Sequence, residues 1–284
     1  MGKYKRNFKS NLADTLIWIF LGVFAIIIIA PIIFMFCASF MTSNEILKMP
    51  FSWIPKSFYY QNYIHAFSGN DGSYIYIRNI LNSFIVASVV TVTTILLSAI
   101  TGYGLAKFKF KGRNFVFMLI MATMMIPFEA IMVPLYLVIT KLGLQDSYTG
   151  LILPFLTNAF GVFMMRQYLI TFPDELLDAA RIDGASELKI FWKIIMPNSL
   201  PVVATLGILT FRSEWDNMLW PLLVVQSEEM KTIPLYIVKF TAEKHTNEGA
   251  MMAVAAIASI PMIILFFALS KYFVSGASLH ASRK

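Results

Sequence analysis

The sequence predicts an all-α polytopic membrane protein with six transmembrane helices and both termini in the cytoplasm. Three observations support this prediction. The 284 residues are 58% hydrophobic and 14% charged, whereas soluble domains average about 25% charged residues. Six mostly uncharged stretches reach or approach the roughly 20 residues that a membrane-spanning helix needs. Most Lys and Arg residues lie on one side of these stretches, and the positive-inside rule assigns that side to the cytoplasm.

Composition excludes several classes of protein. A compact soluble domain would not hide so many large apolar side chains, and disorder requires low hydrophobicity with high charge. The single cysteine, Cys37, excludes an internal disulfide and a cysteine-based metal site. The net charge of +7 is attributed to orientation in a lipid membrane and not to nucleic acid.

Each expected span is justified by length and charge. The first has 25 residues without a formal charge, longer than the 7–15 apolar residues typical of a signal peptide, so it is expected to remain uncleaved. The third contains Glu129, and the fifth contains three charged residues. After a cytoplasmic tail over 1–15, the expected spans are 16–40, 79–106, 114–140, 147–165, 198–225 and 249–270.

The basic residues set the orientation of these spans. The expected cytoplasmic side holds Lys3, Lys5, Arg6, Lys9, Lys107, Lys109, Lys111, Arg113, Arg166, Arg181, Lys189, Lys193, Lys271, Arg283 and Lys284. The opposite side holds Lys48, Lys56, Arg78, Lys141, Lys231, Lys239 and Lys244, while Arg212 lies inside a span. This excess places both termini in the cytoplasm.

The cytoplasmic segment 171–197 differs from the rest of the chain in its density of charge. Pro173 and the acids after it are typical of a helix start. Asp183-Gly184 indicates a break, because glycine readily adopts the left-handed conformation that ends helices. Ser186 is expected to cap a second helix over 187–195, which ends before Pro197. Periodicity alone leaves open an ordinary amphipathic connector lying on the membrane.

The run Asp178-Ala179-Ala180-Arg181-Ile182-Asp183-Gly184, followed by Ala185, Phe191 and Pro197, resembles the EAA loop of ABC importer permeases. Asp178 stands where that family usually has Glu. Other similar stretches are Asn82-Ser83, Tyr103 with Ala106-Lys107, Pro134-Leu135-Tyr136, Trp215 to Pro221 and Thr232-Ile233-Pro234. Along nearly its whole length, the chain is most similar to the smaller six-span permease of maltose-type importers.

The resemblance implies a type I ABC importer permease fold in a bacterial plasma membrane. The chain would import a carbohydrate with a second homologous permease, two ABC ATPases and an extracellular solute-binding protein. Segment 171–197 would be the coupling-helix loop that docks on an ATPase. The implied contact residues are Asp178, Ala179, Ala180, Asp183, Gly184, Ala185 and Phe191. ATP and Mg would bind to the partner ATPases, and this chain itself needs no cofactor.

Charged residues inside the expected spans are candidates for the translocation pathway, because ionisable groups at membrane depth usually face a polar cavity or each other. Arg212 and Asp216 are four residues apart and therefore share a helix face, which favours an ion pair that fixes packing. The alternative is that these charged residues form a polar lining of the translocation pathway. Trp215 and Asn217 are suited to stacking on and hydrogen bonding to a sugar. The candidates are Asn82, Glu129, Arg212, Glu214, Trp215, Asp216 and Asn217.

Other functions lack their motifs. No P-loop sequence is present, and His65, His245 and His280 do not have metal-ligand spacing. The chain is therefore not expected to be an enzyme. A stand-alone secondary transporter or channel is the alternative function, although no internal repeat of the kind common in such transporters is evident. The outer segment 41–78 is a candidate docking surface for a binding protein. The C-terminal tail has one glycine, Gly276, where the family has a glycine-rich stretch.

Overall fold

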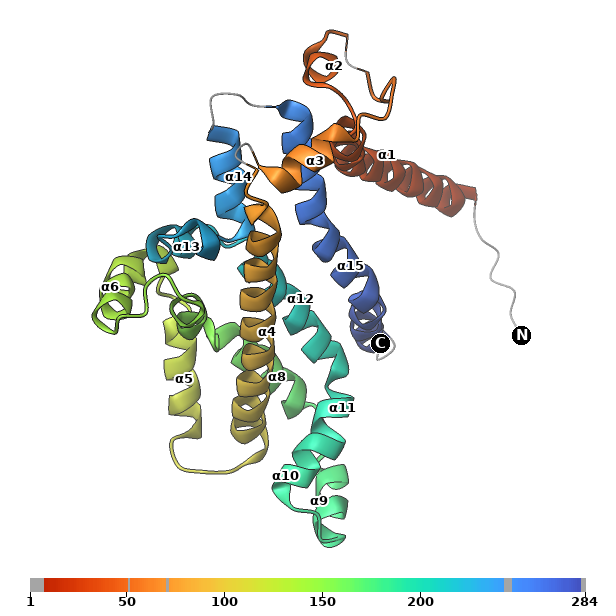
Figure 1. Cartoon of the computed structure of the whole chain (residues 1–284). Helices are drawn as coiled ribbons and strands as arrows, with labels where there is room; N and C mark the ends of the chain where they lie inside the picture. The colour runs from red at the N-terminus through yellow and green to blue at the C-terminus, as the bar shows by residue number, and fades with distance from the viewer. Residues whose placement is uncertain (1–7, 51, 70–71, 243–246, 282–284) are drawn as a thin grey trace. The chain divides into compact units, whose positions relative to one another are not determined.

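The computed structural model describes residues 8–50, 52–69, 72–242 and 247–281, and all its regular elements in these ranges are helical (Figure 1). The predicted all-α fold is confirmed. Several residues used above for orientation lie outside the described residues, as does His245: Lys3, Lys5, Arg6, Lys244, Arg283 and Lys284.

The chain forms two units, one from residues 1–73 and 240–258 and the other from 74–239 and 259–284. The first unit contains α1 (Phe8–Ala38), α2 (Ser43–Leu47), α3 (Gln61–Ser68) and the start of α15 (Glu248–Ala281). The Asn62 amide joins its parts by donating to the carbonyls of Ser39 and Met41 at 2.9 and 2.7 Å. A Cβ at Gly249 would overlap both Asn62 and the Met41 carbonyl.

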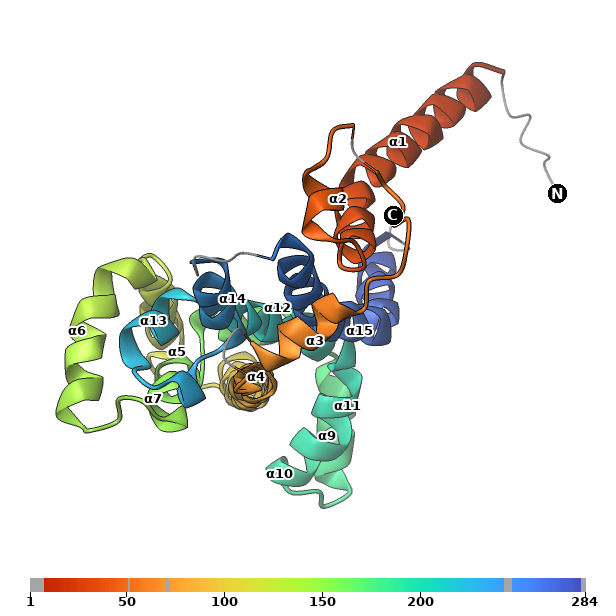
Figure 2. The ribbon, with the colours of Figure 1, turned by 45° about the horizontal axis from the view of Figure 1, so that its top comes forward.

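The second unit is built around α4 (Ile75–Lys107), which packs along α8 (Ala159–Ile170) and α12 (Leu200–Trp215). The approach of α4 to α8 is closest at Gly102, where an added Cβ would lie 2.6 Å from the Cβ of Met165. Figure 2 views α4 nearly along its axis, with α6 and α7 on one side and α9–α11 on the other.

Three helices are long and apolar enough to cross a membrane unbroken, over Asp14–Ala38, Ile75–Lys107 and Glu248–Leu269. They coincide with the first, second and sixth expected spans. The last continues as α15 to Ala281, so the segment expected as a C-terminal tail is helical as far as that residue. Each of the other three expected spans is interrupted.

The third expected span consists of α5 (Arg113–Thr123) and α6 (Phe128–Lys141), which meet at 92°. Pro127 causes the break, because proline has no N–H to donate and disfavours helical backbone at the residue before it. Glu129 consequently lies in the first turn of α6.

The fourth expected span is broken at Asn158, and the fifth, whose helix α12 begins after a 76° bend at Ser199, is broken again at Asn217. Asn158 separates α7 (Tyr148–Ile152) and η1 (Leu153–Phe155) from α8, with a 44° bend, and its Oδ1 accepts from the Gly161 N–H. Asn217 precedes α13 (Leu219–Val224), and its Oδ1 accepts from the Trp220 N–H. Both side chains therefore cap a new helix.

The outer end of the second unit is completed by η3 (Glu228–Met230) and α14 (Ile233–Ala242). Asp146 holds the chain entering this segment, because its Oδ1 accepts from the N–H groups of Gln226 and Ser227 at 2.9 and 3.0 Å. Trp220 is fully buried and donates from Nε1 to the Gly150 carbonyl at 3.0 Å. These contacts fix α13 and the segment after it on α7.

Candidate coupling loop and translocation cavity

Segment 171–197 contains the two short helices that the sequence predicts. The first is α9 (Asp174–Ile182), and the second begins at α10 (Glu187–Ile190). Gly184 lies between them with φ +77°, which is the left-handed conformation expected of it. The Ser186 hydroxyl accepts from the Lys189 N–H at 3.3 Å and caps the second helix.

The predicted end of the second helix before Pro197 is wrong. The helix continues through a π-turn, η2 (Phe191–Ile195), into α11 (Met196–Asn198), which contains Pro197. In the π-turn the Met196 N–H donates to the carbonyl of Phe191, five residues back. The wider turn accommodates a residue that lacks an N–H and whose ring would collide with a carbonyl of an ordinary helix.

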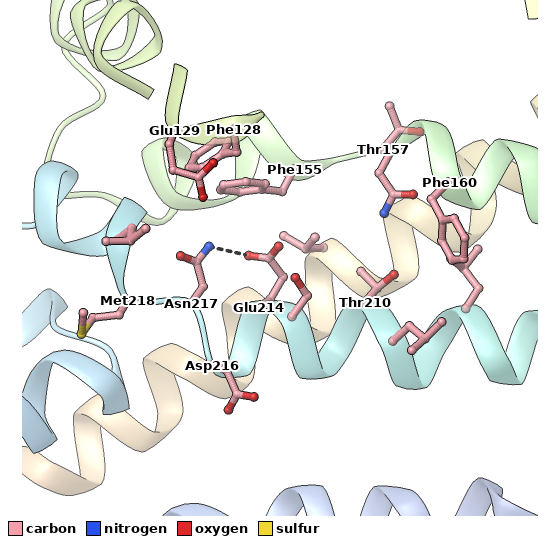
Figure 3. A pocket seen from close by; sticks show the side chains of 16 residues that line it. Phe128, Glu129, Phe155, Thr157, Phe160, Thr210, Glu214, Asp216, Asn217 and Met218 are labelled. Carbon is pink, nitrogen blue, oxygen red and sulfur yellow. Dashed lines mark hydrogen bonds between the residues drawn. The ribbon is translucent and has the colours of Figure 1, made fainter. Parts of the chain in front are cut away.

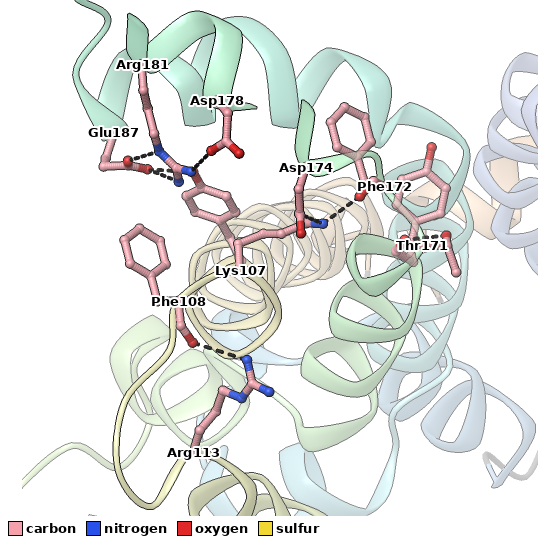
Figure 4. Close-up of polar contacts among 11 residues, drawn as sticks. Lys107, Phe108, Arg113, Thr171, Phe172, Asp174, Asp178, Arg181 and Glu187 are labelled. Atoms are coloured by element: carbon pink, nitrogen blue, oxygen red, sulfur yellow. Dashed lines mark hydrogen bonds and ion pairs between the residues drawn. The ribbon is translucent and has the colours of Figure 1, made fainter. Parts of the chain in front are cut away.

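An ionic network closes the turn between α9 and α10. Arg181 donates from Nη1 to Asp178 Oδ1 at 2.8 Å and from Nε to Glu187 Oε1 at 2.7 Å (Figure 4). The hydroxyl of Tyr103, on α4, donates to the other oxygen of Glu187 at 2.7 Å. The Arg181 guanidinium holds the pKa of the Glu187 carboxyl below its usual range, and Glu187 in turn raises the pKa of Arg181.

Lys107 ties the end of α4 to the start of α9. Its ammonium donates to the Phe172 carbonyl and to Asp174 Oδ1, both at 2.5 Å (Figure 4). The lysine side chain is only 5% exposed, whereas that of Asp174 is 73% exposed. Hydrogen bonding to Lys107 holds the pKa of Asp174 below its ordinary value. The loop is therefore held on α4 by the ion pair of Lys107 and by the hydrogen bond from Tyr103 to Glu187, and these two α4 residues are one helical turn apart.

The predicted ATPase-contact residues differ in exposure. Asp178, Ala179, Asp183 and Gly184 are exposed, whereas Ala180 and Ala185 are half-buried. Phe191 is 4% exposed and belongs to an apolar core with Leu177, Ile190 and Met165. Its side chain is therefore unavailable to a partner, which corrects the expectation for that residue. Phe191 instead anchors the loop on α4 and α8.

Sequence reasoning missed the exposed apolar residues of this loop, of which Ile182 and Leu188 are the most exposed. Ile182 is 86% exposed, and Leu188 is 68% exposed on the next helix. The position of an isoleucine directly before the Asp183-Gly184 turn could have indicated an exposed apolar side chain. Tyr103 and Lys107 were marked in the sequence only by the resemblance of the second span, and their contacts were not predictable, because their partners lie more than sixty residues away in the chain.

A cavity of about 570 Å³ lies beside α12 in the second unit (Figure 3). It brings together four of the predicted pathway residues: Glu129, Glu214, Asp216 and Asn217. Asn217 donates from Nδ2 to Glu214 Oε2 at 3.3 Å. Three phenylalanines and several hydroxyl groups complete much of the lining: Phe128, Phe155, Phe160, Thr157, Thr210 and Ser213. None of the described residues that line the cavity is basic.

The other three predicted pathway residues lie elsewhere. Trp215 is 3% exposed and stacks on Phe211 with centroids 5.6 Å apart, so its ring is not available to stack on a sugar. Asn82 is buried and bonded to protein groups, including the Tyr148 hydroxyl at 2.6 Å. Arg212 makes the expected pair with Asp216, at 3.6 Å, and both side chains are more than half exposed.

Known proteins agree with this architecture. The family model for the inner membrane component of binding-protein-dependent transport systems matches residues 94–278. The arabinooligosaccharide permease AraQ of Bacillus subtilis is 36% identical over 92% of both chains. The sn-glycerol-3-phosphate permease UgpE of Brucella abortus is 36% identical over 94% of this chain and 95% of its own length.

The fold also matches a solved structure. A chain of a bacterial ABC transporter involved in the import of the acidic polysaccharide alginate superposes with a TM-score of 0.84 at 24% identity. The match covers 95% of this chain and 100% of the other. The family model spans well over half of the sequence. The chain therefore belongs to the binding-protein-dependent transport system inner membrane components, as a multi-pass permease subunit of an ABC importer whose partners include the ATPase that hydrolyses ATP.

Proposed function

We propose that this chain is one of two homologous permeases in an importer of neutral carbohydrates, assembled with two ATPases and an extracellular binding protein. The expected six spans, with both termini in the cytoplasm, support a position of segment 171–197 on the ATPase side. The observation that supports coupling best is the braced helix pair α9–α10, with Gly184 and Ile182 at its exposed turn.

We define the docking surface by the loop side chains that are exposed and available to contact a partner. Asp178 is held by Arg181, so its role is to shape the loop as well as to face the ATPase. Ile182 presents an apolar side chain beside Gly184, where a Cβ would meet nothing within 4 Å. Buried apolar anchors supply most of the energy in protein interfaces. The contact core in this proposal is therefore Ala179, Ile182, Asp183 and Gly184, supported by Asp178, Ala180 and Ala185.

The substrate class follows from the cavity and the relatives. The named relatives transport arabinooligosaccharides and sn-glycerol-3-phosphate, so the family carries both neutral and anionic solutes. Glu129 and Glu214 line a cavity that contains no basic lining residue among those described. An ionised carboxylate repels an anion, and this repulsion grows as the dielectric constant falls. Phenylalanine faces and hydroxyl groups suit a neutral sugar, and we assign this cavity to the translocation pathway.

Two glycines with the same backbone conformation allow a controlled test of docking. Gly184 has φ +77° and Gly112 has φ +84°, and an added Cβ meets nothing within 4 Å at either. Gly184→Trp and Gly112→Trp therefore carry similar local strain of roughly 1–2 kcal/mol. We expect Gly184→Trp alone to abolish association with the ATPase and ATP-driven uptake in proteoliposomes. Uptake that survives Gly184→Trp would show that this turn does not dock.

A further inference from the structure

Helix α4 is bound at both ends to a loop of the second unit. We propose that α4 is a rigid connection between the coupling loop and the outer segment 228–233, so that a displacement of either loop is transmitted to the other. Tyr103 and Lys107 are the positioning residues at one end, and Asn79 and Asn82 are those at the other. This inference rests on the proposed function, which places the two loops on opposite sides of the membrane.

At the cytoplasmic end, α4 contacts the start of both loop helices. Lys107 binds the Phe172 carbonyl and Asp174 at the entry to α9, and Tyr103 binds Glu187 in the first turn of α10. Because residues 103 and 107 are four apart, they lie on one face of α4. The Tyr103 ring also packs 5.9 Å from that of Phe191. Movement of the loop without α4 would break all of these contacts.

At the outer end, side chains of α4 form a clamp by binding backbone groups of the outer segment 228–233. Asn79 donates from Nδ2 to the carbonyls of Glu228 and Lys231 at 3.1 and 2.9 Å. Asn82 donates to the carbonyls of Glu229 and Lys231 at 2.7 and 2.9 Å. Ser83 accepts from the Ile233 N–H at 2.8 Å. The side chains that α4 supplies here are buried, and leaving a buried polar group unpaired costs about 1–3 kcal/mol.

Between these ends α4 is a single unbroken helix. Its 33 residues contain no proline, which is a main cause of sharp helix kinks. They extend over about 50 Å at 1.5 Å per residue, which is more than the roughly 30 Å hydrocarbon core. Gly102 seats α4 directly against α8 near the cytoplasmic end, where an added Cβ would overlap Met165. A helix held in this way transmits displacement along its axis.

The test measures the accessibility of the outer segment while the nucleotide state of the ATPase is changed at the other end of α4. Gln226→Cys, in a Cys37→Ser chain with cysteine-free partners, introduces a thiol at the exposed residue just before the clamp. The complete importer is reconstituted in nanodiscs, and the rate of labelling by a water-soluble maleimide is measured with and without ATP and vanadate. Uptake of sugar is measured in proteoliposomes of the same preparations.

Trapping the nucleotide is expected to change the labelling rate in the parent complex. The single variants Tyr103→Phe, Lys107→Met and Asn82→Leu are expected to lose most of that change, while the amount of ATPase that copurifies stays normal. Combining Lys107→Met with Asn82→Leu should cause little further loss, because the two residues act in series. Thr93→Val is the control, because the Thr93 hydroxyl donates to the carbonyls of Val89 and Val90 in its own helix.

The outcomes separate this inference from the proposed function. If the parent complex transports sugar but its labelling rate does not change with nucleotide, α4 does not connect the loops. The same conclusion follows if Tyr103→Phe and Lys107→Met keep the full change, or if Thr93→Val loses it equally. A parent complex that assembles with its ATPase but shows no ATP-dependent uptake overturns the proposed function instead, whatever the labelling shows.

Discussion

Two glycines of α4, two positions apart, meet different surroundings. A Cβ at Gly102 would lie 2.6 Å from the Met165 Cβ and 2.9 Å from the Arg166 backbone nitrogen, whereas a Cβ at Gly104 would meet nothing within 4 Å. Glycine lowers helix stability by about 1 kcal/mol relative to alanine. At Gly102 this cost is offset by the close approach of α8, and at Gly104 no such contact requires glycine.

Gly102→Ala is therefore expected to destabilise the permease, because the added methyl group forces α4 and α8 apart and overpacking typically costs about 1–3 kcal/mol. Gly104→Ala is expected to leave stability unchanged or to raise it slightly. Thermal unfolding of the purified complex in detergent, monitored by intrinsic fluorescence, measures both. Equal midpoints for the two variants would contradict the close packing at Gly102.

The residues that sequence predicted well are those whose role is local. Gly184 and Ser186 were identified because a left-handed glycine and a serine N-cap act within a few residues of themselves. Trp215 was wrongly predicted to be open to a sugar, because burial depends on elements distant in the chain. The residue is only 3% exposed. The contacts of Tyr103 and Lys107 were missed for the same reason, since each finds its partner on a segment that folds back from far along the sequence.

Some of the helix breaks within the expected spans have a local marker in the sequence, and others do not. Hydropathy averages over a window and identifies an apolar stretch, but it does not detect a 92° bend such as that between α5 and α6. Pro127 and the capping asparagines Asn158 and Asn217 were visible in the sequence and mark the interruptions. The π-turn before Pro197 was not predictable, because an ordinary helix end before proline is equally consistent with the sequence.

The connection between α4 and α9 predicts a defined dependence on pH. Lys107 holds the pKa of Asp174 below its usual value, so the stabilisation is present above the unfolded pKa of about 3.9. It is lost as the pH falls through the lower folded pKa. Because Asp174 is largely exposed, the pair is expected to contribute only about 0.2–1 kcal/mol.

Asp174→Asn is accordingly expected to lower the unfolding midpoint by a constant amount between about pH 5 and pH 8, since the wild-type pair stays ionised throughout that window. The difference should shrink as the pH falls further towards 3. Thermal unfolding across this pH series tests the expectation, with Glu175→Gln as the control for loss of charge in the same turn. A difference that grows on acidification would contradict the pairing.

For the whole molecule, the scarce charges are informative because of where they lie. Composition was sufficient to predict a membrane protein, and the loop motif was sufficient to predict its family. The cavity was only partly predictable, since its lining comes from residues near 128, 157 and 214 that meet through folding. Four charged or polar residues were identified because such groups are costly inside a span, whereas the phenylalanines beside them are indistinguishable in sequence from packing residues.

The charge of the cavity predicts selectivity against anions. The lining contains the carboxyl groups of Glu129, Glu214 and Asp216 and no basic residue among those described, which disfavours a phosphate or carboxylate, whereas a neutral sugar meets hydroxyl, amide and aromatic groups. The importer, supplied in turn with the binding protein for each solute, is expected to carry arabinooligosaccharides but little sn-glycerol-3-phosphate. Glu129→Gln and Glu214→Gln should raise uptake of the anion relative to the sugar, because each replaces a carboxyl group that repels anions when it is ionised with an uncharged amide.

Radiolabelled uptake into proteoliposomes measures this ratio directly. Glu175→Gln removes an equal charge from the exposed loop and should leave the ratio unchanged. The assignment of the cavity to the translocation pathway is wrong if the wild type carries the phosphate ester as readily as the sugar. It is also wrong if the two cavity variants behave like Glu175→Gln, because the carboxylates would then act outside the path of the solute.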